Sequence, residues 1–95
     1  MNTNLITFIK NLQTKYYNNE ITTALLIEDI EFEIKTTIKD DKIRGILLEI
    51  LDRGFNLNDP YYYTHTLKRI DDGDKELLNK VINNLINNYN HFMSL

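Results

Sequence analysis

The spacing of the apolar residues limits this chain more than any other feature of its sequence. Leucine, isoleucine, valine and the aromatic residues recur three or four positions apart along most of its 95 residues. Such a period lines apolar side chains along one side of an amphipathic helix. The two clearest runs are Ile43, Ile46, Leu47, Ile50 and Leu51, and Leu78, Val81, Ile82, Leu85, Tyr89 and Phe92.

Five helices are predicted from these runs, at about residues 3–18, 20–39, 41–53, 60–70 and 75–92. The first backbone N–H groups of a helix need hydrogen-bond acceptors, and short polar side chains occur at the predicted helix starts. Proline at a first helical position strengthens one of these starts. The predicted capping residues are Thr3 or Asn4, Asp40 or Asp41, Asp59 ahead of Pro60, and the run Asp71-Asp72-Gly73-Asp74, which ends the fourth helix and caps the fifth.

Asparagine and glycine are expected where the helices end. Asn18 and Asn19 are predicted to end the first helix, because asparagine tolerates the left-handed backbone conformation. Gly54 is predicted to follow the end of the third helix, with Phe55 supplying the apolar contact that often accompanies such a cap. Gly45, inside the same helix, is interpreted as a point of close helix crossing.

Residues 20–39 allow two interpretations. As a helix, one apolar face holds Ala24, Ile27, Ile30, Ile34 and Ile38, and a second holds Ile21, Leu25 and Phe32. Residues 29–35 alternate polar and apolar side chains, which is typical of a strand. The length of the pattern and the lack of a partner strand favour the helix. The predicted fold is an all-α compact bundle of four to five short helices, one domain over residues 1–95, with an α+β fold as the alternative.

Composition excludes several classes of function. The chain has no cysteine, so thiolate metal sites and thiol nucleophiles are ruled out. A net charge of −3 gives no general attraction to nucleic acid or to an anionic membrane. No apolar run reaches the length of a membrane span, roughly 20 residues. A cytoplasmic protein with no membrane or nucleic-acid partner is therefore expected.

No set of residues carries a recognisable chemistry. His65 and His91 are the only histidines, and neither has a second ligand at helical spacing. We found no phosphate-binding loop and no nucleophile–base pair. We therefore expect no metal, no cofactor and no catalytic residue.

The triple tyrosine at 61–63 is the strongest candidate for a binding surface. Successive residues of a helix point about 100° apart, so three in a row cannot all be buried. If Tyr63 faces inward with Leu67 and Ile70, then Tyr61 or Tyr62 is exposed. Exposed tyrosines are enriched at protein interfaces. Tyr61, Tyr62 and His65 are the predicted partner-binding residues.

An acidic run in residues 28–33 offers an alternative face. Glu28, Asp29 and Glu31 form a docking surface for a basic partner in one interpretation, and an ordinary solvated helix face in the other. Glu31 also stands four residues before Lys35, the favourable orientation for a helix ion pair.

Together these features favour a non-enzymatic protein–protein interaction domain. We expect a small inhibitor, immunity or modulator protein that binds one larger partner, and a homodimer through a leftover apolar face is a further expectation. Its abundant Asn, Ile, Lys and Tyr are residues of AT-rich codons, which indicates a low-GC bacterium, phage or mobile element. The alternative is a helix–turn–helix-like DNA-binding transcriptional regulator that presents Tyr62, His65, Lys68 and Arg69 outward.

Overall fold

The computed structural model describes residues 5–94, and within this range it contains helices and no strand. The all-α prediction is therefore confirmed, and the alternative strand at 29–35 is wrong, because those residues lie inside a helix. The elements are α1 Leu5–Tyr17, α2 Thr23–Thr37, α3 Asp41–Phe55, the π-helix η1 Tyr62–Leu67, α4 Lys68–Asp71 and α5 Lys75–Met93.

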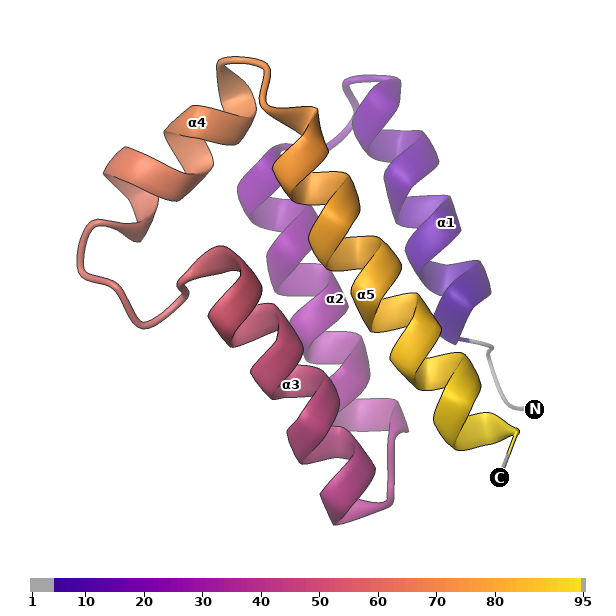
Figure 1. Cartoon of the computed structure of the whole chain (residues 1–95). Helices are drawn as coiled ribbons and strands as arrows, with labels where there is room; N and C mark the ends of the chain where they lie inside the picture. The colour runs from indigo at the N-terminus through magenta and orange to yellow at the C-terminus, as the bar shows by residue number, and fades with distance from the viewer. Residues whose placement is uncertain (1–4, 95) are drawn as a thin grey trace.

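The four long helices run side by side, and the short η1–α4 segment leans away from them at one end (Figure 1). α2 contacts both α1 and α3, and α5 makes its most extensive contact with α3. The apolar faces meet in one cluster of buried side chains. Its fully buried members are Leu5, Ile9, Leu26, Ile27, Ile30, Ile34, Leu47, Leu51, Phe55, Ile70, Leu78, Ile82 and Leu85.

Several predicted helix ends are confirmed. Asn19 adopts a positive φ of 61° after α1. The carboxylate of Asp40 accepts hydrogen bonds from the first backbone N–H groups of α3, and that of Asp74 accepts one from Leu77 N at 3.2 Å. Short polar side chains therefore set these boundaries. The predicted caps Thr3 and Asn4 lie outside the described residues.

The predicted roles of the two glycines in α3 are wrong. The helix continues through Gly54, and Asn56 takes the left-handed conformation instead, with φ 54°. A Cβ added to Gly54 would lie 2.7 Å from Val81 Cγ1, so Gly54 is where α3 and α5 approach closely. A Cβ added to Gly45 would meet nothing within 4 Å, so no close crossing occurs there.

The predicted helix at 60–70 starts later and turns differently. Asp59 Oδ1 accepts a hydrogen bond from Tyr61 N at 2.8 Å, and this turn keeps Pro60 outside the helix. The segment then begins as a π-helix, whose turns are wider because its hydrogen bonds join residues five apart. The residue five before Leu67 is Tyr62, so Tyr62 faces inward in place of Tyr63.

Candidate functional site

The three consecutive tyrosines separate into one buried and two exposed side chains. Tyr62 is 9% exposed, whereas Tyr61 and Tyr63 are 59% and 65% exposed. The prediction that Tyr63 faces the core is therefore wrong, for the π-helical reason given above. Tyr62 was predicted to contact a partner, but its ring lies in the core, so it leaves the set of candidate contact residues.

The exposed aromatic rings in η1 and at Tyr61, just before it, each contact another ring. The rings of Tyr61 and His65 are stacked, with centroids 5.2 Å apart and planes inclined by 24°. The ring of Tyr63 stands edge-on against that of Tyr62, with centroids 5.2 Å apart. We call Tyr61, Tyr63 and His65 the aromatic patch.

Tyr62 itself has a raised pKa. Burial is the main cause, and it raises the pKa of Tyr62 above its ordinary value of 10.0. The charges that Tyr63, Glu28 and Glu31 carry when ionised raise it further. The buried hydroxyl therefore stays protonated in neutral solution.

The side of α2 opposite the core carries exposed apolar residues between carboxylates. Phe32 is 66% exposed and Leu25 is 41% exposed, although both are large and apolar. Residues spaced by three, four and seven positions share one side of a helix. We call this side the outer face of α2, and its members are Leu25, Glu28, Asp29, Phe32 and Glu33.

The acidic residues of α2 differ in their pairing. Glu31 forms an ion pair with Lys35, with Oε1 and Nζ 2.6 Å apart, as its sequence spacing predicted. Glu28, Asp29 and Glu33 make no ion pair with any other residue in 5–94. Of the predicted acidic residues, Glu28 and Asp29 are therefore available to a partner, and Glu31 is already paired.

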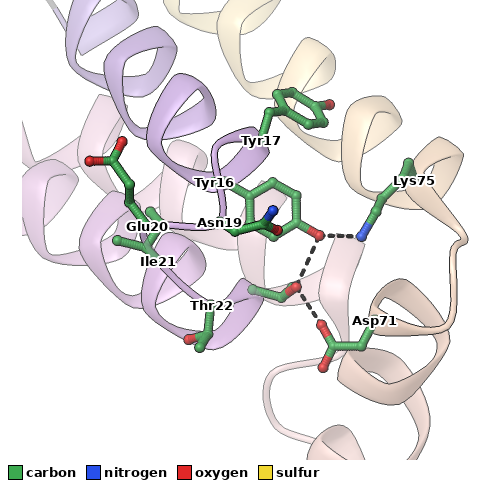
Figure 2. A pocket seen from close by; sticks show the side chains of 9 residues that line it. Tyr16, Tyr17, Asn19, Glu20, Ile21, Thr22, Asp71 and Lys75 are labelled. Carbon is green, nitrogen blue, oxygen red and sulfur yellow. Dashed lines mark hydrogen bonds between the residues drawn. The ribbon is translucent and has the colours of Figure 1, made fainter.

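A separate polar cavity of about 600 Å³ opens where the α1–α2 turn meets the α4–α5 turn (Figure 2). Lys75 Nζ donates hydrogen bonds to Tyr16 OH and, at 3.0 Å, to Ile70 O. Thr23 Oγ1 lies 3.1 Å from Tyr16 OH and 2.6 Å from Asp71 Oδ1. A chain of hydrogen bonds thus links four helices at this end of the molecule.

The direction of this chain follows from the chemistry of its members. A carboxylate only accepts, so the single Thr23 hydroxyl proton goes to Asp71, and Tyr16 donates to Thr23. Tyr16 in turn accepts from the Lys75 ammonium group. Thr23 and Tyr16 are buried, and their hydroxyl groups are held by the other members of the chain. The arrangement ties helices together, and no sequence pattern relates residues this far apart.

The two histidines of the chain lie on different elements. His91 lies in the last turn of α5, while His65 belongs to the aromatic patch. Among residues 5–94, no three His, Cys, Asp or Glu side chains lie close enough to hold a metal ion. In the same range, no helix has the length and apolar character needed to cross a membrane.

The basic residues expected to serve a DNA-binding helix are engaged within the chain. Lys68 Nζ pairs with Asp72 Oδ2 at 2.9 Å, and Arg69 pairs with Asp74. Tyr62, expected to point outward beside them, is buried. The α4 segment therefore presents paired charges of both signs.

Comparisons with protein-family models, with curated proteins and with solved structures find no match for this chain.

Proposed function

We propose that this chain is a non-enzymatic protein–protein interaction domain that binds one larger partner and acts by covering part of that partner's surface. An inhibitor, immunity or modulator protein of the cytoplasm fits this description. The observation that carries the proposal is the exposed aromatic patch with its contacting rings.

The aromatic patch has the properties of an interface centre. Tyrosine contributes a large contact area with few rotatable bonds, and it often supplies much of the binding energy of an interface. Tyr61 and Tyr63 are both more than half exposed, and each ring is held by a neighbouring ring. Pre-ordered rings lose less conformational entropy when a partner binds.

The polar groups best placed for chemistry have structural partners. In the cavity of Figure 2, Thr23, Tyr16, Asp71 and Lys75 are linked to one another, and no histidine joins them. A nucleophile needs both an adjacent base and access to substrate. This supports an interaction role over an enzymatic one.

The test is affinity capture from a lysate of the source organism, with the wild-type chain and the double variant Tyr61→Ala/Tyr63→Ala as baits. We expect the wild type to retain one stoichiometric protein and the double variant to retain about tenfold less of it. Tyr17→Ala is the matched control, because Tyr17 is another exposed tyrosine, on α1. Equal retention by the double variant, or no protein retained by the wild type, contradicts the proposal.

A parallel titration with duplex DNA at low salt tests the alternative function. We expect no binding, because Lys68 and Arg69 are ion-paired and the chain is negatively charged. Salt-sensitive binding that disappears in Lys68→Glu/Arg69→Glu would identify a DNA-binding protein instead.

A further inference from the structure

The outer face of α2 is an apolar stripe that the fold leaves uncovered. Leu25 and Phe32 stand seven residues apart, which is about two turns or about 10 Å along the helix. Asp29 lies between them on the same side, and Glu28 and Glu33 flank them. Leu26, Ile27, Ile30 and Ile34 on the inner side of α2 are buried in the core. The apolar residues of the outer stripe are therefore not part of the core.

The unpaired charge around this stripe is negative, and its one cation, Lys35, is neutralised by an ion pair. Glu28, Asp29 and Glu33 have no ion-pair partner among residues 5–94, and Lys35, the lysine of α2, is paired with Glu31. Unpaired carboxylates beside an exposed phenylalanine favour a ligand that is both apolar and cationic. Charge complementarity of this kind speeds association and excludes acidic partners.

A second copy of this chain fits the same face poorly. A two-fold dimer places the same surface of both subunits in contact. Glu28, Asp29 and Glu33 of one copy would then oppose their equivalents in the other, on chains that each carry a net charge of −3. Like charges brought together at an interface oppose binding.

We propose that the outer face of α2 binds a cationic amphipathic helix of the partner. Apolar side chains of that helix, spaced three, four and seven residues apart, contact Leu25 and Phe32, and its Lys or Arg side chains pair with the flanking carboxylates. This inference rests on the proposed function and specifies the chemistry of its partner.

The direct test uses a synthetic peptide probe, a fluorescently labelled amphipathic helix of about 18 leucine and lysine residues. Fluorescence anisotropy should show binding that weakens as salt rises from about 50 mM to about 200 mM. The same peptide with glutamate in place of lysine should not bind. We expect Phe32→Ala to weaken binding about tenfold and the triple variant Glu28→Gln/Asp29→Asn/Glu33→Gln to do so by at least as much.

Two matched variants control for general effects. Met93→Ala removes an exposed apolar side chain at the end of α5, and Glu20→Gln removes an exposed carboxylate outside α2. Both should bind the peptide as the wild type does. Because Phe32 is exposed, its variant should also keep the wild-type melting temperature. Binding that is unchanged in Phe32→Ala, or reduced equally in Glu20→Gln, overturns the inference.

Two further measurements separate this inference from its competitors. Analytical ultracentrifugation that shows a dimer lost in Phe32→Ala assigns the face to a second copy and overturns the proposal. In the affinity capture, a partner lost with Tyr61→Ala/Tyr63→Ala but retained by Phe32→Ala overturns the α2 inference and leaves the proposed function standing. Peptide binding through Phe32 without any captured partner supports the α2 inference and contradicts the proposed function.

Discussion

Two regions of the molecule use their apolar residues in opposite ways. One is the contact between α3 and α5, and the other is the surface formed by α2 and η1. Along α3 and α5, the apolar side chains face each other, and Gly54 leaves room for Val81 between the helices. On α2 and η1, one set of apolar side chains fills the core while a second set stays outside. The exposed set is Leu25, Phe32, Tyr61 and Tyr63.

This difference distinguishes residues needed for folding from residues available for binding. Substitutions in the α3–α5 contact should change stability. Substitutions on the outer side of α2 and η1 should leave stability nearly unchanged, because those side chains are already in water. Tyr62 is the exception within the second region, since its ring belongs to the core.

The largest expected effect is at Tyr62. Tyr62→Ala removes a buried ring and should lower the free energy of unfolding by about 3 kcal/mol. Tyr63→Ala, its neighbour in sequence, should change it by less than about 0.5 kcal/mol. Urea denaturation followed by circular dichroism measures both. Equal losses at the two positions would show that the aromatic patch is part of the core.

The second expected effect is a contrast between two glycines of one helix. Gly54→Ala places a methyl group against Val81 and should destabilise the chain by about 1–3 kcal/mol. Gly45→Ala meets open space and should stabilise it by about 0.5–1 kcal/mol, since alanine favours helix more than glycine does. Thermal melts of both variants measure this contrast.

The double variant Gly54→Ala/Val81→Ala provides the control. If the Gly54 methyl group acts by collision with Val81, the two substitutions together should cost less than the sum of their separate costs. Strict additivity would show that α3 and α5 are not in close contact at this point.

The smallest expected effect is in alkaline solution. Burial and nearby negative charge raise the pKa of Tyr62 in the folded state above the ordinary value of 10.0. The unfolded chain therefore loses the Tyr62 proton first, so this contribution to stability is complete below about pH 10 and falls as pH rises above it. Tyr62→Phe should lose less stability than the wild type between about pH 10 and about pH 12. If the stability of the wild type and that of Tyr62→Phe fall equally as pH rises, the Tyr62 hydroxyl is exposed to water.

The sequence alone was enough to predict the helices. The apolar period and the polar capping residues gave the elements and several of their ends, because helix formation and capping depend on residues a few positions apart. Residues 29–35 show the limit of this local pattern. Their strand-like alternation could be read either way, and their place in α2 reflects the burial of Ile30 and Ile34 against the neighbouring helices.

The candidate surface was only partly predictable, because sequence patterns report only on residues a few positions apart. The sequence selected the tyrosines and the acidic run of α2 as candidates, but not which tyrosine is buried. A π-helical turn places Tyr62 inward. The chain from Lys75 to Asp71 was not predicted, because its members come from four different helices.

The sequence by itself thus favoured an all-α chain, and it determined the approximate positions of most helices and the residue types left over from its apolar faces. The tertiary structure decided which leftover residues remain exposed and which become neighbours. The physical reason is range: caps and helical faces depend on nearby residues, whereas the exposure of Phe32 and the close approach at Gly54 depend on the helices packed around them.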